Sequence, residues 1–164
     1  MADDELLKLV VDIGVVLKQR GWKLALAESC TGGGAAYAVT DVAGSSAWFE
    51  RGFVTYDNDA KMEMLGVCAE TLEKFGAVSE QTSREMAQGA LGRSHAQVSA
   101  AISGIAGPDG GTVEKPVGTV CFAWITIEGN LRSETCHFDG DRAEVRRKSV
   151  KHALRGLLQA VACS

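Results

Sequence analysis

The sequence predicts an α/β fold, a three-layer α/β/α sandwich around a mixed sheet of about five strands. Three observations predict it. Segments in which apolar residues recur at helical spacing alternate with short apolar runs typical of strands. Two glycine-rich segments follow such runs, as ligand-binding loops do in open α/β sheets. A turn at Gly129 and Asn130 joins two consecutive strand patterns, which predicts an antiparallel hairpin at one side of the sheet.

The first half of the chain is expected to begin with a helix over residues 3–19, capped by Asp3 or Asp4 and closed by Gly21 in a left-handed conformation. An apolar run over 23–27 then predicts a buried strand. The remaining elements follow from the same patterns: a small-residue helix near 35–39, a strand over 48–56 interrupted by Gly52, and short helices over 60–65 and 69–75.

The second half begins with a helix that Ser79 can cap, with Met86 and Ala90 on its apolar face. Its other elements are a strand over 98–103, a glycine-rich loop over 104–116, hairpin strands over 118–128 and 131–138, and a final helix from about 142. No repeat and no linker separates two halves. We therefore expect residues 1–164 to form a single domain.

Charge and hydropathy exclude several classes of protein. The formal net charge of −4 argues against binding nucleic acid through a broadly basic surface. No apolar run approaches the length of a membrane span, and the N-terminus is acidic rather than signal-like. We expect a cytoplasmic protein with no nucleic-acid or membrane partner.

The cysteines give no sign of a metal or redox site. They are odd in number and none forms a C-x-x-C pair: Cys30, Cys68, Cys121, Cys136 and Cys163. The sequence offers no plausible ligand cluster, so we expect no metal and no cofactor. A reducing compartment fits free thiols best.

The first segment that could carry chemistry is residues 28–33, Glu-Ser-Cys-Thr-Gly-Gly. A hydroxyl on a tight strand-to-helix turn, such as that of Ser29, is exposed beside backbone N–H groups that can hold an oxyanion. The spacing matches neither the phosphate-binding loop nor the G-x-S-x-G elbow. From the residues alone it remains open that Ser29 and Thr31 only cap the helix.

The second such segment is residues 103–111, where several glycines let the backbone approach a ligand and Pro108 stiffens the turn. The alternative is a mobile surface connection.

A serine nucleophile needs a base, and none of the three histidines follows a glycine-rich strand end, so a Ser-His-Asp triad is not favoured: His95, His137 and His152. Lys61 is the best candidate base, since burial lowers the pKa of a lysine. Tyr56 could stack on a ring or relay a proton. Arg142 and Arg146 could reach a phosphate, although each of these side chains is equally compatible with a solvated surface position.

Seven segments taken together resemble the CinA C-terminal domain family, which includes nicotinamide-nucleotide amidohydrolases. They cover nearly the whole chain: residues 27–33, 40–49, 55–61, 76–80, 103–111, 114–120 and 140–142. The resemblance implies hydrolysis of the amide of nicotinamide mononucleotide, giving nicotinate mononucleotide and ammonia without a cofactor. It further implies a stand-alone form of the domain and a homo-oligomer.

The resemblance also implies roles for individual residues. Ser29 would be the nucleophile and Lys61 its activator, with Tyr56 nearby and Arg142 on the phosphate or the amide. For this scheme the N–H groups of Thr31, Gly32 and Gly33 are expected to stabilise the oxyanion, with Cys30 beside them in the substrate site. The glycine loop is expected to shape the nucleotide pocket through Gly104, Gly107, Gly110 and Gly111.

Two departures from the family pattern affect the expected activity. Asp57 and Asp59 stand where Ser and Glu are common, and an added carboxylate would raise the pKa of Lys61 and weaken it as a base. Gly34 replaces a bulkier residue. The alternative function is therefore a catalytically weak or inactive paralogue that acts as a nucleotide-binding or regulatory module. A role in DNA uptake gets little support from the acidic charge.

Overall fold

The computed structural model describes residues 3–162, so Met1, Ala2, Cys163 and Ser164 lie outside the described part of the chain. Its elements are α1 (Asp4–Arg20), β1 (Leu24–Glu28), α2 (Gly34–Thr40), the 3-10 turn η1 (Ser45–Ala47), β2 (Phe49–Val54), α3 (Asn58–Leu65), α4 (Ala69–Phe75), α5 (Glu80–Gly92), β3 (Val98–Gly104), β4 (Thr119–Thr126), β5 (Leu131–His137) and α6 (Arg142–Ala162).

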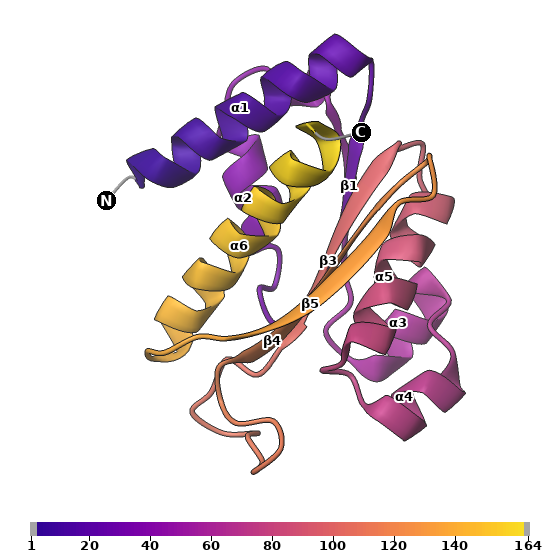
Figure 1. Ribbon diagram of the computed structural model, residues 1–164, viewed down its shortest axis with the longest axis vertical. Helices are drawn as coiled ribbons and strands as arrows, with labels where there is room; N and C mark the ends of the chain where they lie inside the picture. The colour runs from indigo at the N-terminus through magenta and orange to yellow at the C-terminus, as the bar shows by residue number, and fades with distance from the viewer. Residues whose placement is uncertain (1–2, 163–164) are drawn as a thin grey trace.

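The strands form one five-stranded mixed sheet in the order β2-β1-β3-β4-β5. β1 pairs in parallel with β2 and β3, whereas β4 and β5 are antiparallel to their neighbours. Helices α1, α2 and α6 cover one face of the sheet, and α3, α4 and α5 cover the other (Figure 1). The predicted three-layer α/β/α sandwich is confirmed.

Most predicted boundaries are confirmed to within two residues, and so are the caps. Asp3 caps α1 by accepting from the Leu6 N–H at 3.1 Å, and Gly21 ends that helix with φ +66°. The Ser79 side chain accepts from the Thr82 N–H at 3.1 Å and so caps α5. The predicted strand 48–56 is too long. β2 ends at Val54, because the carbonyls of the next two residues turn toward a lysine of α3 instead of extending the ladder.

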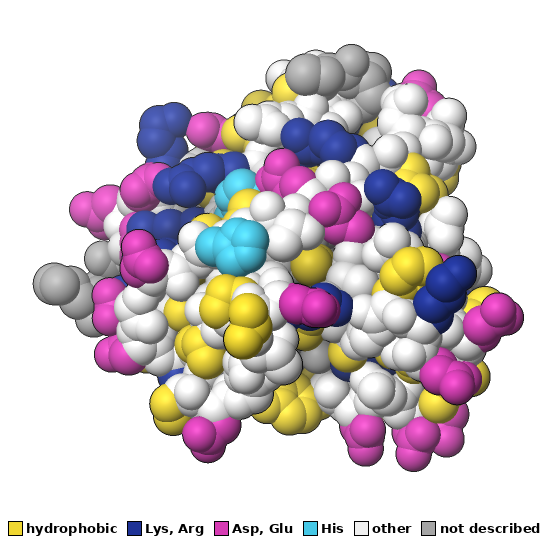
Figure 2. Space-filling model, turned by 60° about the horizontal axis from the view of Figure 1, so that its bottom comes forward, with side chains coloured by type: hydrophobic (Ala, Val, Ile, Leu, Met, Phe, Trp, Pro, Cys, Tyr) yellow, Lys and Arg dark blue, Asp and Glu magenta, His cyan; other side chains and the backbone are white. Residues whose placement is uncertain are grey.

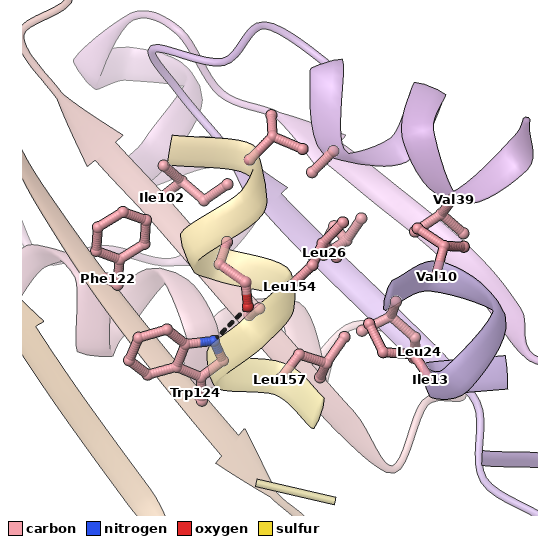
Figure 3. Close-up of a cluster of buried hydrophobic side chains, with 14 of the residues drawn as sticks. Val10, Ile13, Leu24, Leu26, Val39, Ile102, Phe122, Trp124, Leu154 and Leu157 are labelled. Atoms are coloured by element: carbon pink, nitrogen blue, oxygen red, sulfur yellow. Dashed lines mark hydrogen bonds between the residues drawn. The ribbon is translucent and has the colours of Figure 1, made fainter. Parts of the chain in front are cut away.

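The core between the sheet and α1, α2 and α6 is built from large side chains, several of which Figure 3 labels. Trp124 of β4 is 1% exposed, and its Nε1 donates to the carbonyl of Ala153 in α6 at 2.8 Å. A Cβ on Gly156 would lie 2.1 Å from Trp124 Cζ2. The absence of a side chain at this position therefore lets α6 lie directly against the indole.

The opposite face of the sheet presents small side chains: Ala25, Ala27, Ala101 and Ala123. Because successive strand residues alternate between faces, Leu24 and Leu26 of β1 point to the other side. α5 packs on the alanine face through Met86, Ala87 and Ala90, as its predicted apolar face requires. Within residues 3–162, no helix has the length and apolar character to cross a membrane.

Candidate active site

The parallel part of the sheet gathers the predicted site residues at one edge. The carboxyl ends of β2, β1 and β3 lie side by side, so Ser29 after β1, Tyr56 after β2 and Gly104 at the end of β3 meet there. They surround a small cavity of about 160 Å³. Larger hollows of about 350 to 660 Å³ lie elsewhere on the described chain, but none of them is lined by Ser29 or Lys61.

Lys61 and Ser29 form the centre of this cavity. Lys61 Nζ lies 3.1 Å from Ser29 Oγ, 3.0 Å from the carbonyl oxygen of Thr55 and 3.1 Å from that of Tyr56. The lysine is 1% exposed and the serine 7% exposed. An ammonium donates to all three oxygens. A neutral amine has two N–H groups for the two carbonyls and one lone pair left for the proton of the Ser29 hydroxyl.

Burial lowers the pKa of Lys61 below its ordinary value, because desolvation penalises the charged form. The carboxylate of Asp57 acts in the opposite direction, as its place in the sequence led us to expect, and so does Cys30. Desolvation is the larger effect. Burial thus makes the neutral amine, the state that can accept a proton, more accessible than in an exposed lysine.

Glu28, the last residue of β1, fixes the turn that carries Ser29. Its side chain is 1% exposed and accepts from Thr31 Oγ1 at 2.7 Å, from the Ala35 N–H at 2.8 Å and from the Ala36 N–H at 3.0 Å. The carboxylate therefore occupies the first N–H groups of α2, which begins after Gly33 without a side-chain cap.

The glycines of this turn supply conformation. Gly32 and Gly33 have φ of +57° and +100°, a region that residues with a Cβ rarely adopt. The Gly32 N–H donates to the Ser29 carbonyl at 3.0 Å, so it is already used within the turn.

Cys30 lines the cavity but its thiol is not a second nucleophile. The side chain packs in the core at 6% exposure, and burial raises the pKa of the thiol to about 12. The contribution of Cys30 to the site is consequently that of its backbone.

Arg142, the first residue of α6, closes the cavity from the other side. Asp141 and Glu144 form a reciprocal capping box at the start of this helix, with 2.9 Å and 3.2 Å hydrogen bonds to each other's backbone N–H. Arg142 Nη1 donates to the Gly107 carbonyl at 2.8 Å and Nη2 donates to Tyr56 Oη at 3.3 Å. Tyr56 is 63% exposed, so this pair forms the rim of the cavity.

Arg146 lies one turn further along α6 and has a different environment. It donates to the carbonyls of Cys30 at 3.1 Å and Thr31 at 3.3 Å, so it supports the serine turn from behind. It does not line the serine cavity, whereas Arg142 does.

The structure thus brings some of the sequence-predicted residues to one cavity and leaves others outside it. Those that line it are Ser29, Cys30, Tyr56, Lys61, Gly104 and Arg142. Those that do not are Thr31, Gly32, Gly33, Gly107, Gly110 and Gly111. Gly107 reaches the site through Arg142, while Gly110 and Gly111 are exposed on the 104–118 loop.

Sequence reasoning missed five lining residues: Asn58, Ala77, Val78, Ser103 and Ala106. Ser103 had a usable signal. Glu28 pairs with Ile102 in the parallel ladder, so the residues that follow them lie side by side at this edge: Ser29 has left β1, whereas Ser103 still pairs with Cys121 of β4. Ser103 Oγ donates to the Ala77 carbonyl at 2.8 Å and so holds the segment before α5 against the cavity.

A family model, curated relatives and a solved structure all match nearly the whole chain. A family model described as the CinA C-terminal domain matches residues 6–161. The nicotinamide-nucleotide amidohydrolase PncC of Escherichia coli strain K12 is 55% identical over 159 residues, which are 97% of this chain and 96% of that protein. PncC of Enterobacter agglomerans is 52% identical over 97% of both chains. The crystal structure of competence/damage inducible protein CihA from Agrobacterium tumefaciens superposes with a TM-score of 0.94 at 47% identity, covering 99% of this chain and 98% of that one.

Proposed function

This chain belongs to the CinA C-terminal domain family, and from that premise we propose that it hydrolyses the carboxamide of nicotinamide mononucleotide to nicotinate mononucleotide and ammonia, with Ser29 as nucleophile and Lys61 as base. Similarity to named amidohydrolases over nearly the whole chain makes the protein an enzyme. The observation that carries the mechanism is the 3.1 Å contact between Lys61 Nζ and Ser29 Oγ in a buried setting.

In the first half of the reaction, the neutral amine of Lys61 takes the proton of the Ser29 hydroxyl as Oγ attacks the carboxamide carbon. The carbonyl oxygen becomes an oxyanion. The Cys30 N–H, directly after the nucleophile, has the position that supplies an oxyanion donor in serine hydrolases. Lys61 then returns the proton to the departing nitrogen. The C–N bond breaks, ammonia leaves and an acyl ester remains on Ser29.

In the second half, water takes the place of the leaving group. Lys61 accepts a proton from the water as its oxygen attacks the ester carbon, and returns that proton to Ser29 Oγ as the ester bond breaks. The carboxylate product leaves with the hydroxyl restored. One amide and one water thus give one carboxylic acid and one ammonia, and transfer of the acid's proton to the ammonia gives carboxylate and ammonium, with no redox change.

The size of the cavity supports one orientation of the substrate. At about 160 Å³ it is smaller than the ~300–1,000 Å³ typical of sites that enclose a whole ligand. It therefore suits the carboxamide and its ring, with the ribose phosphate outside over the rim that Tyr56 and Arg142 form. The Arg142 guanidinium is the cation on that rim, and a guanidinium pairs well with a phosphate.

A pure binding module is the competing function, and the dyad argues against it. Burying a lysine beside a serine costs stability, and binding a nucleotide does not require it. The charges in view also fit a small anionic substrate better than a nucleic acid, since acidic and basic side chains are interspersed over the face in Figure 2.

The decisive experiment measures ammonia and nicotinate mononucleotide released from nicotinamide mononucleotide by the wild type, Ser29→Ala and Lys61→Met. We expect turnover in the wild type and a loss of at least about 10³-fold in both variants. Cys68→Ser, which replaces an exposed cysteine outside the cavity, is the matched control and keeps full turnover. Wild-type protein that binds the nucleotide by calorimetry without releasing ammonia would instead establish the binding module.

Three further features belong to the same proposal. The free state of Cys30, Cys68, Cys121 and Cys136 supports a reducing cytoplasm. Exposed apolar side chains along α1, namely Leu7, Val11 and Val15, support self-association into a homo-oligomer. One sheet with helices on both faces supports a single domain. Light scattering of the purified protein tests the second of these, and a monomeric mass would contradict it.

A further inference from the structure

A second cluster of reactive side chains lies between β5 and α6, outside the serine cavity. Cys136 Sγ lies 3.4 Å from His152 Nε2, and the same nitrogen is hydrogen-bonded to Glu134 Oε1. The three donor atoms all lie within 4.8 Å of one another. None of the three lines the serine cavity, and the proposed mechanism uses none of them.

The fold assembles this cluster from two elements. Glu134 and Cys136 are two residues apart in β5, so their side chains project from the same face of the sheet, toward α6. His152 comes from the middle of α6. Spacing along the chain gave no sign of a ligand cluster, because its members are separated by a turn and half a helix.

The distances suit tetrahedral coordination. With zinc–sulfur and zinc–nitrogen bonds of about 2.3 and 2.05 Å, two ligands at a tetrahedral angle lie roughly 3.5 Å apart. The observed 3.4 Å between Cys136 Sγ and His152 Nε2 matches that edge. The carboxylate oxygen of Glu134 needs only a small side-chain movement to exchange its hydrogen bond for a metal bond.

The surroundings hold the imidazole in place and leave the cluster accessible. The His152 ring packs against both Phe122 and Phe138, with centroid distances of 4.6 and 5.9 Å. All three candidate ligands are partly exposed, so an ion can reach them from solvent and a water can complete the coordination. The aromatic wall on one side lowers the local dielectric, which strengthens binding of a cation by a thiolate and a carboxylate.

We propose that Glu134, Cys136 and His152 bind one thiophilic divalent cation, Zn²⁺ above others, with three protein ligands and a fourth position open to water. Thiolate and imidazole select zinc over the oxygen-preferring cations Mg²⁺ and Ca²⁺. The ion joins β5, at the edge of the sheet, to α6. It sits on the helix that carries Arg142, ten residues or about 15 Å further along, and so outside the serine cavity.

Cobalt titration of the intact, chelator-treated protein tests the proposal, since Co²⁺ reports a bound thiolate through a charge-transfer absorption band. We expect one Co²⁺ per chain with that band, displaced by an equivalent of Zn²⁺. Cys136→Ser abolishes the band and His152→Gln weakens Co²⁺ binding at least about tenfold. Zn²⁺ also raises the melting temperature of the wild type, and this rise is lost in both variants.

The controls replace the same residue types outside the cluster. Cys68→Ser removes an exposed thiol, and His137→Gln removes the exposed histidine next to Cys136 in β5. Both keep the band and the melting shift. A wild type that shows no thiolate–cobalt band, or a band that Cys68→Ser rather than Cys136→Ser removes, overturns the proposal. Circular dichroism confirms that each variant is folded before titration.

Discussion

Lys61 Nζ and Ser29 Oγ lie 3.1 Å apart although their residues are 32 positions apart in sequence. The contact forms because β1 and β2 are parallel neighbours, so the turn after one strand and the helix after the other begin at the same edge of the sheet. The carbonyl oxygens of Thr55 and Tyr56 also accept hydrogen bonds from the Lys61 amine and fix its position. The lysine is therefore positioned by contacts with the protein itself.

The first prediction concerns the pH dependence of turnover. Burial lowers the pKa of Lys61, and only its neutral form can accept the proton of Ser29. We expect kcat/KM to rise with pH up to that lowered pKa and then to level off. Asp57→Asn removes the carboxylate that raises this pKa, so it shifts the rising limb to lower pH. A limb that does not move in Asp57→Asn, or that moves to higher pH, contradicts the assignment of the base.

The second prediction concerns stability and follows from the same shift. The folded pKa of Lys61 lies below the unfolded value of about 10.5. Between these two values the unfolded chain binds more protons, so the contribution of Lys61 to the free energy of unfolding rises with pH and is lost as pH falls through the folded pKa. Lys61→Met lacks this contribution. Urea unfolding of both proteins from neutral pH to about 10 should show a difference that grows in favour of the wild type.

That difference isolates the lysine charge. Met leaves the two carbonyls without their donor, but carbonyls do not titrate, so this cost is the same at every pH. A difference independent of pH would mean that the folded and unfolded chains hold the Lys61 proton equally well.

The sequence identifies the candidate nucleophile and base of this site, but it does not identify the contacts that bury them and hold them in place. Ser29 and Lys61 stand out because a hydroxyl and a lysine follow two predicted strands, and the cap at Ser79 follows from local chemistry alone. The burial of Lys61 could not be derived, since it depends on which strands become neighbours. Glu28 was in view as part of the turn but had no assigned role, because a carboxylate at a strand end acquires one only when the N–H groups of α2 are placed against it.

The third prediction concerns the rim. Arg142 donates to Tyr56 Oη and to the Gly107 carbonyl, which aims the guanidinium at the mouth of the cavity. We expect Arg142→Gln to lower kcat/KM by about 10–100-fold, because one hydrogen bond to a charged group contributes a free energy that corresponds to a factor of this size. Tyr56→Phe should cost less. Because the two side chains act as a pair, the double variant should lose less than the product of the single losses.

Arg147→Gln is the control for the rim, since Arg147 is exposed on α6 and lines a different hollow. It should leave kcat/KM unchanged. Strict multiplicativity of the Arg142 and Tyr56 effects would show that the tyrosine does not orient the arginine.

The fourth prediction concerns Glu28. Its two oxygens accept from one hydroxyl and two backbone N–H groups, and the residue is buried. In Glu28→Gln one oxygen becomes an NH₂ group that faces a backbone donor. We expect the free energy of unfolding to fall by about 1–3 kcal/mol, measured by urea denaturation. Glu63→Gln, an exposed carboxylate on α3, is the control and should be nearly neutral. An equal effect of the two variants would show that the Glu28 charge does not stabilise the turn.

The fifth prediction concerns the contact between α6 and the sheet. A methyl group at Gly156 would lie 2.1 Å from Trp124 Cζ2, and the indole cannot retreat without breaking its hydrogen bond to the Ala153 carbonyl. Gly156→Ala gains about 1 kcal/mol in helix propensity, yet overpacking costs typically 1–3 kcal/mol and more where the neighbour is fixed. We therefore expect a net loss of stability by urea denaturation. Gly92→Ala at the end of α5, where a Cβ meets nothing within 4 Å, should be neutral or slightly stabilising. If both variants gain stability, α6 can shift from β4 at little cost, and the position of Arg142 on the same helix is set by its capping box and its contact with Gly107 instead.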